Sequence, residues 1–468
     1  MRETLEREDK WAVDSDFVLP TIDDLARDAE VHTDTVELDS VYYDTRDYDL
    51  RAHGIVVRRR AGDDDTGWQV KLPTAHGRLE LRWPLSDSPP QELKGLLTGA
   101  TLGKELTNAA TIRTQRQRRR LTTRGDLRYE VADDTVHAST GADLLAWREI
   151  EVELGPGVSA VPKKLRRRLR AAGAKPSTYP SKLAHATGLS APPALPKAAG
   201  AIADYLSEQI DQIIIGDIDL RRGRDPIHDT RVAIRRLRST LRVFDDVLHD
   251  VAPNFDSELK WFAGLLGDVR DSQVQQNRFA KAVDALPEDL VLGPVRSRIR
   301  SDLQAIELPA RKAVDEAMQS TRYLDILAVL RRWRTNPPVD AELAGKTLRK
   351  HGRKAGRKAV QRLNQAFDGK DPALFHRARK AAKRARYAAE LVAPLDPSVD
   401  QRRKQHKKVQ SVLGDHQDAM VAIGTLRRLA GVAGTSVGEN GFTYGLLYAR
   451  EEGIAEDCRT AARTLNQS

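Results

Sequence analysis

The sequence is short of cysteine, of aromatic residues and of long apolar runs. Its single cysteine, Cys458, excludes a framework of internal disulfides and a zinc site built on cysteine pairs. No run of about 18 apolar residues occurs, so no transmembrane helix is expected. The first ten residues, MRETLEREDK, lack the apolar core of a secretory signal. We therefore expect a soluble, cytoplasmic protein.

Positive charge is in excess along the chain. Its 468 residues contain 77 Lys and Arg against 67 Asp and Glu, which gives a formal net charge of +10 and a pI near 9.5. This balance indicates an anionic partner, such as a polyphosphate, a nucleic acid or a membrane surface. The length allows two or three domains, each with its own core.

The character of the sequence changes near residue 190. Residues 1–188 contain short alternating runs interrupted by Gly, Asp and Pro, whereas residues beyond 200 are rich in Ala, Leu, Arg and Lys with helical spacing. Between them, residues 189–200 read as a Pro/Ala linker. The expected fold class is therefore α+β multidomain, with an N-terminal α+β domain at 1–188 and an all-α domain at 201–468.

Charged residues recur at every second position in the N-terminal domain. In LEREDKW, the residues Glu6, Glu8 and Lys10 share one face of a strand, and WREIEVEL repeats the pattern with three glutamates. A single run of this kind is usually a solvated strand face. Here one run is purely acidic and another purely basic, which favours a closed sheet with charged faces around a polar lumen. A metal–phosphate complex would satisfy both clusters, because carboxylates need a cation between them and basic groups need a polyanion.

The same segments resemble the CYTH family, the triphosphate tunnel enzymes. EREDK matches the E-x-E-x-K signature of that family, and YYDTRDYDL, VVRRR, GRLELRWPL, VADDTV, WREIEVEL and PSKL follow in family order across residues 1–188. The resemblance implies a closed, eight-stranded antiparallel β tunnel with helices. It also implies metal-dependent hydrolysis of tripolyphosphate or a related triphosphate, by attack of water on a terminal phosphoryl group.

The resemblance assigns residues to three roles. The expected catalytic residues are Glu6, Glu8 and Lys10. Hard oxygen ligands suit Mg²⁺ or Mn²⁺, and the expected ligands are Glu6, Glu8, Glu149, Glu151, Glu153 and Asp133, with Asp134 as the alternative to Asp133. Guanidinium and ammonium groups match phosphate, and the expected substrate-binding residues are Lys10, Arg58, Arg60, Lys71, Arg82, Arg116, Arg118 and Lys182. Arg78 and Glu80 could equally form a structural ion pair.

The helical domain contains the same unit twice. HDTRVAIRRLRSTLRVF, residues 228–244, aligns with HRARKAAKRARYAAEL, residues 376–391, at an offset of 376 − 228 = 148. LGDVRDSQV aligns with LGDHQDAMV at an offset of 413 − 266 = 147. Two blocks at nearly one offset indicate a duplication, with halves at about 201–335 and 339–468. In each half the basic residues share one helix face, so an anion is expected opposite.

At these residues the chain resembles the CHAD domain, the conserved histidine α-helical domain. The resemblance implies two four-helix bundles around a basic channel that binds inorganic polyphosphate. The expected binding residues are His228, Arg231, Arg235, Arg238, Arg242, Lys260, His376, Arg379, Lys383, Arg386 and Lys407. Glu390 stands at the counterpart of Arg242 and breaks the symmetry of the two halves. The aspartates of the LGDxxD blocks are expected to cap or position the basic helices rather than to hold a metal.

These features are compatible with four functions. They favour a metal-dependent inorganic triphosphatase whose helical domain binds polyphosphate over a catalytically inactive polyphosphate adaptor, a nucleic-acid binder and an adenylate cyclase. Aromatic residues make up only 5% of the chain, which disfavours a nucleic-acid partner because base stacking needs aromatic side chains. The expected partners are a triphosphate substrate and inorganic polyphosphate, without a membrane partner, in a cytoplasmic protein that can associate with polyphosphate granules.

Overall fold

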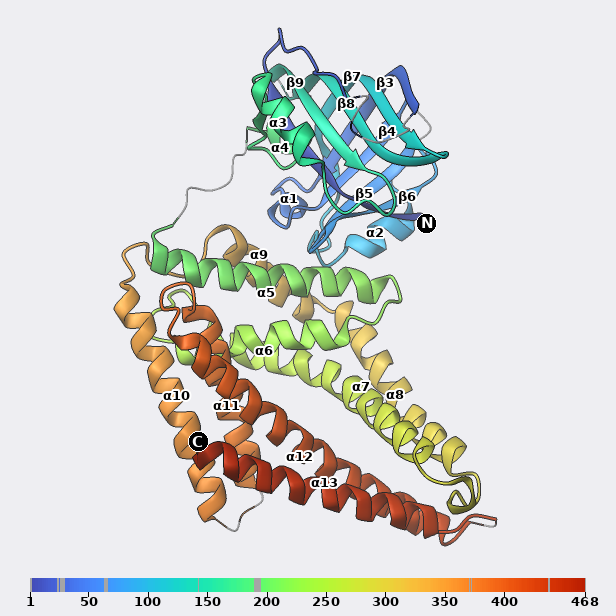
Figure 1. The fold of residues 1–468 in the computed structure, drawn as a ribbon, viewed down its shortest axis with the longest axis vertical. Coiled ribbons are helices and arrows are strands. Elements are labelled where there is room, and N and C mark those ends of the chain that lie inside the picture. The colour runs from blue at the N-terminus through green and yellow to red at the C-terminus, as the bar shows by residue number, and fades with distance from the viewer. Residues whose placement is uncertain are drawn as a thin grey trace. The chain divides into compact units, whose positions relative to one another are not determined.

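The computed structural model describes the chain except for residues 1, 23–24, 26–29, 63–65, 142, 189–194, 370, 372, 437 and 468. The chain divides into two compact units, Met1–Pro193 and Ala194–Ser468 (Figure 1). Of the expected linker, residues 189–194 lie outside the described part. Residues 197–200 of that linker are helical instead, because the first helix of the second unit begins at Lys197.

The N-terminal unit is built on one antiparallel sheet of ten strands in the order β1-β6-β5-β4-β3-β7-β8-β9-β2-β10. The strands are β1 (Arg2–Glu6), β2 (Glu8–Val13), β3 (Glu30–Asp44), β4 (Val56–Ala61), β5 (Gly67–Thr74), β6 (Gly77–Trp83), β7 (Thr107–Thr123), β8 (Asp126–Thr140), β9 (Asp143–Leu154) and β10 (Lys175–Pro176). Four short helices accompany them: α1 (Asp49–Ala52), α2 (Gln91–Leu97), α3 (Lys163–Ala171) and α4 (Lys182–Ala186).

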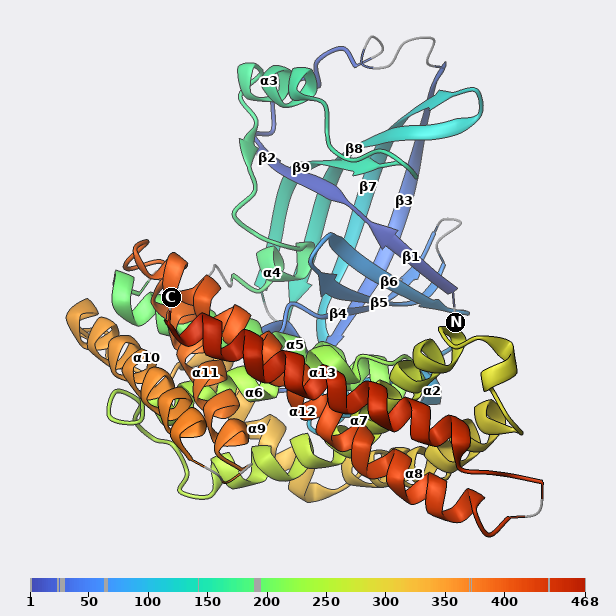
Figure 2. The same cartoon turned by 60° about the horizontal axis from the view of Figure 1, so that its bottom comes forward.

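The expectation of a closed eight-stranded tunnel is wrong, since the sheet has ten strands and two edges, β1 and β10. The physical reason lies at Arg7, where the expected first strand is interrupted. Before Arg7 the chain pairs with β6, and after it the chain pairs with β9, at the other end of the strand order. Because only one residue separates β1 from β2, the two run in line (Figure 2) while belonging to opposite ends of a curved sheet.

Glycine is required where β6 meets β1. Gly77 has a φ of +141°, and a Cβ at this position would lie 2.2 Å from the carbonyl oxygen of Glu6. Any side chain at this position would therefore push apart β1, which carries Glu6, and β6, which carries Arg78.

The two faces of the sheet differ as the alternating pattern predicts. The outer face of β2, β8 and β9 carries Trp11, Val131, Ile150 and Val152, which form one buried cluster with apolar residues of α3. Because side chains alternate across a strand, the charged residues between these positions point to the concave inner face. This burial positions the acidic groups of β2 and β9 side by side.

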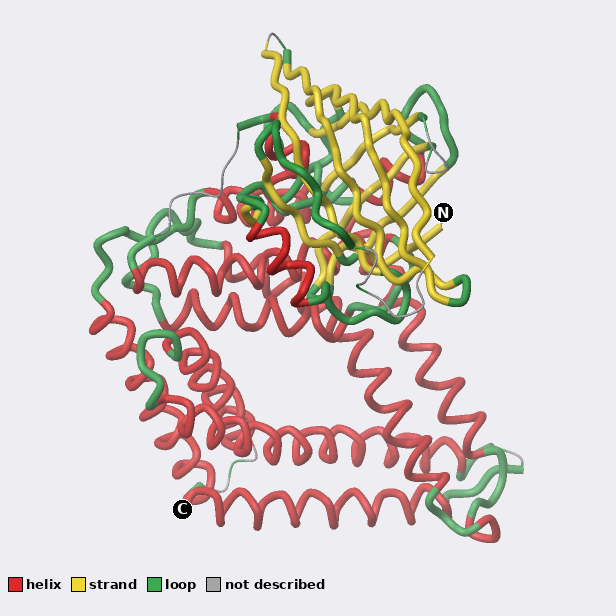
Figure 3. Tube along the Cα trace, turned by 45° about the horizontal axis from the view of Figure 1, so that its top comes forward, coloured by secondary structure: helices red, strands yellow, loops and turns green. Residues whose placement is uncertain are grey.

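The C-terminal unit consists of helices, apart from one isolated β-bridge between Leu248 and Val339, and contains two halves. The first half consists of α5 (Lys197–Arg221), α6 (Ile227–Val243), α7 (Phe255–Asp284), the 3₁₀ turn η1 (Glu288–Leu290), α8 (Val295–Met318) and α9 (Thr321–Thr335). The second half consists of α10 (Gly345–Asp368), α11 (Ala373–Val392), α12 (Val399–Ala433) and α13 (Phe442–Gln467). Figure 3 shows the contrast between this unit and the strand-rich one.

Residues of both halves pack in one hydrophobic core, and the first half has one α-helix more than the expected four-helix bundle. Phe279 and Leu303, from α7 and α8, lie in one buried cluster with Leu426 and Tyr444, from α12 and α13. The first half contains a fifth α-helix, α9, which packs against α5, α7 and α8. Among the described residues, no helix is both long and apolar enough to cross a membrane.

Candidate functional site

The concave face of the N-terminal sheet encloses a pocket lined by charges of both signs. Its lining residues are Glu6, Glu8, Lys10, Tyr42, Val56, Arg58, Arg60, Lys71, Arg78, Arg116, Glu151, Ser181 and Lys182. They come from β1, β2, β3, β4, β5, β6, β7, β9 and the start of α4. The fold therefore brings together in this pocket most of the charged residues predicted from the alternating runs of the sequence.

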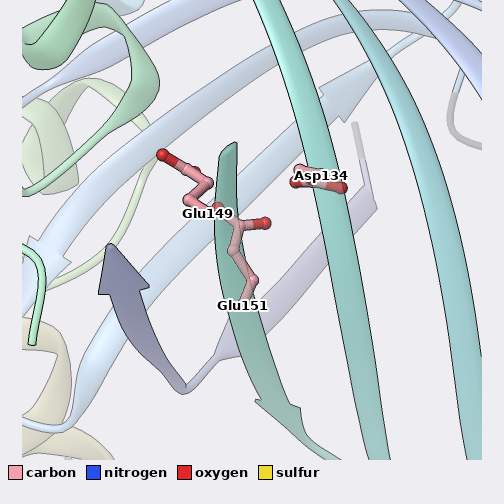
Figure 4. A group of neighbouring side chains, drawn as sticks. All are labelled: Asp134, Glu149 and Glu151. Atoms are coloured by element: carbon pink, nitrogen blue, oxygen red, sulfur yellow. The ribbon is translucent and has the colours of Figure 1, made fainter. Parts of the chain in front are cut away.

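Three carboxylates gather at one side of this pocket. Asp134 lies on β8, and Glu149 and Glu151 lie on the neighbouring β9 (Figure 4). One oxygen from each lies within 4.8 Å of the others, and all three residues are buried. Hard carboxylate oxygens at this separation fit the preferences of Mg²⁺ or Mn²⁺.

Lys182 lies at the centre of these carboxylates. Its Nζ is 2.8 Å from Asp134 Oδ2, 2.7 Å from Glu149 Oε1 and 2.8 Å from Glu151 Oε1. Ser181 positions it by capping α4, where its side chain accepts a hydrogen bond from the backbone N–H of Ala184. The ammonium group thus lies where a divalent cation would meet the same oxygens.

Glu151 is surrounded by cations. Lys10 and Arg116 both form ion pairs with its carboxylate, in addition to Lys182. Burial alone would raise the pKa of Glu151, but these three positive charges outweigh it and hold the pKa well below its ordinary value. The carboxylate is therefore ionised and available as a ligand at any physiological pH.

Two other carboxylates, Glu6 on β1 and Glu153 on β9, have a raised pKa, whereas the pKa of Glu80 on β6 is lowered like that of Glu151. Burial raises the pKa of Glu6 to about 8, although Lys71 lies 2.5 Å away and opposes the shift. Burial likewise raises the pKa of Glu153 to about 7. Glu80 accepts ion pairs from Lys71 at 3.1 Å and from Arg82 at 2.5 Å. Despite its burial, these cations hold the pKa of Glu80 below its ordinary value.

Two further basic residues line the pocket without a carboxylate as hydrogen-bond partner. Arg58 and Arg60 lie on β4 and are buried. Arg58 donates a hydrogen bond to Gln69 at 2.5 Å, and Arg60 donates one to Ser40 at 3.3 Å. Burial, and then the neighbouring Arg58, lowers the pKa of Arg60 to about 10. Two buried cations with neutral hydrogen-bond partners form a site for an anion with several oxygens.

Some predicted residues lie elsewhere. Asp133 is outside the acidic cluster, on the other face of β8, where Arg148 forms a bidentate pair with it at 2.9 and 2.7 Å. Arg118 pairs with Asp34 and does not line the pocket. Arg78 lines the pocket and donates a hydrogen bond to the carbonyl oxygen of Pro180 at 2.7 Å, instead of pairing with Glu80.

The C-terminal unit contains a basic cleft of about 560 Å³ between its two halves. The facing helices α6 and α11 supply most of its walls, and α7 and α12 supply the rest. Its charged and histidine residues are His228, Arg231, Arg235, Arg238, Arg242, Arg270, Asp271, Arg278, His376, Arg379, Lys380, Lys383, Arg384 and Asp418. Eight of the eleven residues predicted to bind polyphosphate lie among them.

Four cations of the cleft have no acidic partner. In the described part of the chain, Arg235, Lys380, Lys383 and Arg384 form no ion pair within 4.0 Å, whereas Arg231, Arg238 and Arg379 each lie within that distance of an aspartate. Burial lowers the pKa of Lys383 to about 7, and the charges of Arg379 and Arg235 add to the shift. Burial also lowers the pKa of Arg235. An uncompensated cluster of this kind is stabilised by a bound anion.

The second aspartate of each LGDxxD block contacts a basic helix. Asp271 accepts an ion pair from Arg231 at 2.9 Å, and Asp418 lies 3.8 Å from Arg379. These contacts agree with the expected positioning role.

Three predicted residues do not line the cleft: Arg386, Lys260 and Lys407. The reason is clearest for Arg386, which is held by Glu390 at 2.9 Å and by Gln410 at 3.2 Å. Glu390 also pairs with Arg236 at 3.1 Å. Glu390, which has an arginine as its counterpart in the first half, therefore holds Arg236 and Arg386 outside the cleft.

Four lining cations were missed by the sequence analysis: Arg270, Arg278, Lys380 and Arg384. Lys380 and Arg384 directly follow Arg379 and Lys383, and a helix face about 100° wide includes such neighbours. Arg270 lies within LGDVRD itself. Spacing on α7 could therefore have identified Arg270, whereas Arg278 carried no signal.

Comparison with known proteins follows the division into two units. The CYTH domain model matches residues 6–179 and the CHAD domain model matches residues 204–427. Two uncharacterised Mycobacterium tuberculosis proteins, from two strains, are 34% identical over 490 residues, covering 97% of this chain and 94% of each relative.

Two solved structures are similar to part of the chain. PptA from Streptomyces chartreusis is 22% identical, with a TM-score of 0.48 over 58% of this chain and 99% of that one. The CHAD domain from the plant Ricinus communis is 27% identical, with a TM-score of 0.49 over 59% of this chain and 94% of that one. CYTH domains are metal-dependent triphosphate tunnel enzymes. The chain belongs to the proteins in which a CYTH domain is followed by a CHAD domain.

Proposed function

We propose that the N-terminal unit is a metal-dependent triphosphatase acting on tripolyphosphate or a related triphosphate, and that the C-terminal unit binds inorganic polyphosphate. The observation that carries the first part is the pocket that the carboxylates of β2 and β9 line together with the arginines of β4. Acidic and basic groups around one small volume suit a metal–phosphate complex better than either ion alone.

Asp134, Glu149 and Glu151 would hold the divalent cation, with Glu8 beside them on β2. Bound there, the cation would polarise a phosphoryl oxygen and provide charge against the developing anion. The chain itself supplies Arg58 and Arg60 to orient the phosphate oxygens. Lys10 and Lys182, which share carboxylate partners with such a cation, can turn toward the phosphates in the same pocket.

The basic cleft supports the second part of the proposal. Four of its described cations form no ion pair, and among the described lining residues only Tyr387 carries a Phe, Tyr or Trp ring. A nucleic acid would need stacking platforms for its bases, whereas a polyphosphate chain needs only charge. The cleft therefore favours an anion without bases.

The test is to incubate the protein with tripolyphosphate, long-chain polyphosphate, ATP and duplex DNA, with and without Mg²⁺ or Mn²⁺. Binding and phosphate release are measured in the same samples. We expect metal-dependent release from tripolyphosphate and tight binding of long chains. Binding without release under every metal condition would identify an inactive adaptor, and preference for duplex DNA over polyphosphate would overturn the assignment of the cleft.

A further inference from the structure

A second groove lies on the C-terminal unit, on the α10, α11 and α12 side of the second half. It encloses about 560 Å³. Its apolar and small lining residues are Gly352, Gly356, Val360, Ala385, Ala389, Val392 and Val399. None of them lines the basic cleft, so this groove is separate from the proposed polyphosphate site and independent of that proposal.

The internal duplication identifies what covers the corresponding place in the first half. With the 147-residue offset of the LGDxxD blocks, 255 + 147 = 402, 258 + 147 = 405 and 259 + 147 = 406. The resulting residues, Arg402, Gln405 and His406, all line the groove. Their counterparts on α7 are Phe255, Glu258 and Leu259.

In the first half, two of these counterparts are in contact with α9. The ring of Phe255 packs edge-on against Trp333, with centroids 4.9 Å apart. Glu258 forms an ion pair with Arg322 at 2.5 Å. Helix α9 therefore covers the first-half equivalent of the groove.

The side chains at the base of the groove are also smaller than their counterparts in the first half. With the 148-residue offset, the buried residues Leu237, Leu241 and Phe244 correspond to Ala385, Ala389 and Val392. The smaller side chains leave the space that the groove encloses. Val360, at its side, is apolar and 51% exposed, so a docked helix could cover it.

The charges around the groove are reversed relative to the first half. There, the basic helix α9 meets acidic residues: Arg322 pairs with Glu258, and Arg334 pairs with Asp211 at 2.9 Å. The second-half groove is lined instead by Arg349, Arg353, Arg357 and Arg402, with Asp396 as the one acidic lining residue described. In the described part of the chain, none of these four arginines belongs to an ion pair within 4.0 Å.

We propose that the groove between α10 and α12 binds an amphipathic helix of a partner protein, with one apolar face and acidic flanks. The occupant is helical because α9 fills the equivalent place in the first half. It is acidic because the row of arginines on α10 repeats every four residues and so runs along the length of a docked helix.

The test uses the full chain and a fluorescent 15-residue probe peptide. The probe has the sequence of Thr321–Thr335 with its four arginines, Arg322, Arg331, Arg332 and Arg334, replaced by glutamate. Two control peptides have the unchanged sequence and a scrambled version of the acidic one. We expect saturable one-to-one binding of the acidic probe, at least tenfold tighter than either control, measured by fluorescence anisotropy.

Variants of the protein locate the site. Val360→Asp and the double substitution Arg353→Glu with Arg357→Glu should each weaken binding of the probe at least tenfold. Leu308→Asp, which alters an exposed leucine of α8 away from the groove, should leave it unchanged. Circular dichroism should show that all variants keep the wild-type helix content.

Several outcomes would overturn the proposal. Equal binding of the scrambled peptide would indicate charge attraction alone. Binding that Val360→Asp and the double substitution leave intact would place the probe elsewhere. Self-association of the free protein that Val360→Asp abolishes would identify a second copy of the chain as the occupant, and no binding of the acidic probe would remove the docking site altogether.

Discussion

Lys182 Nζ lies 2.7 Å from Glu149 Oε1 and almost as close to the two neighbouring carboxylates of the acidic cluster. This contact makes a side chain of the protein the counter-ion of the proposed metal site. Burial alone would lower the pKa of Lys182, but the acidic residues around it raise the pKa well above its ordinary value. The ammonium group is therefore charged whenever the protein is folded.

Removing this counter-ion should make the fold depend on a metal. Lys182→Met leaves buried carboxylates with fewer cations, and breaking a buried ion pair costs about 3–5 kcal/mol. We expect a lower Tm in EDTA and a larger rise in Tm on adding Mn²⁺ than in the wild type, measured by thermal unfolding. Lys163→Met, on the exposed surface of α3, is the control. Equal metal responses in both variants would contradict the placement of the metal among these carboxylates.

Glu6 should contribute both to metal-dependent phosphate release and to the pH dependence of the protein's stability. Its pKa of about 8 lies above the ordinary value of 4.5, so the folded state binds its proton more tightly than the unfolded chain does. The contribution to stability is present below about pH 4.5 and is lost as the pH rises toward 8. Glu6→Gln should therefore flatten the fall in Tm between pH 5 and 8 and reduce metal-dependent phosphate release about 100-fold or more.

The control for Glu6→Gln is Asp14→Asn, which changes an exposed carboxylate just after β2. It should keep both the Tm profile and the rate of phosphate release. If Glu6→Gln retained full metal-dependent release, Glu6 would have no role in the reaction.

Charge reversal should weaken polyphosphate binding when it is made at residues that line the basic cleft, but not at residues beside the cleft. Arg379→Glu with Lys383→Glu should weaken binding of long-chain polyphosphate by about 100-fold or more, because charged hydrogen bonds contribute about 1.5–3 kcal/mol each. Arg386→Glu, on the same helix but held by Glu390, should change it little. Affinities are measured by titration calorimetry at fixed salt, and tripolyphosphate hydrolysis should continue in both variants. Loss of hydrolysis as well would indicate one shared site.

Binding in the cleft should weaken as the pH rises. Lys383 has a pKa of about 7, lowered by burial and by Arg379, Arg235 and Arg231, so it loses its charge near neutrality in the free protein. A bound polyanion raises that pKa, and the complex takes up a proton. We expect polyphosphate affinity to fall between pH 6 and 8. Calorimetry in buffers of different ionisation enthalpy should detect the uptake.

Lys383→Arg provides the matched control for this pH dependence, since a guanidinium group stays charged throughout the range. Its affinity should vary less between pH 6 and 8. An unchanged pH profile in this variant would assign the effect to other groups of the cleft, such as His228 and His376, whose pKa values burial also lowers.

The local sequence pattern correctly predicted which residues share a strand face, but it did not predict how separate strands pair. The alternation in WREIEVEL predicted that Glu149 and Glu151 share a face, and strand geometry requires it. The choice between Asp133 and Asp134 depended on the register of β8 against β9, which one-residue spacing cannot reveal. The closed tunnel was wrong because Arg7 divides the first strand between two neighbours, and strand partners are not written in the pattern of a single strand.

The helical unit shows the same division. The repeated spacing from His228 and His376 predicted the basic face of α6 and α11, because a helix places residues three and four apart together. Whether Arg386 enters the cleft depended on Glu390, whose partners come from α6 as well as α11. The sequence by itself determined which residues share a face of a strand or helix, since backbone geometry sets that locally. Only the tertiary structure decided which faces meet, because long-range pairing and burial select among partners far apart in the chain.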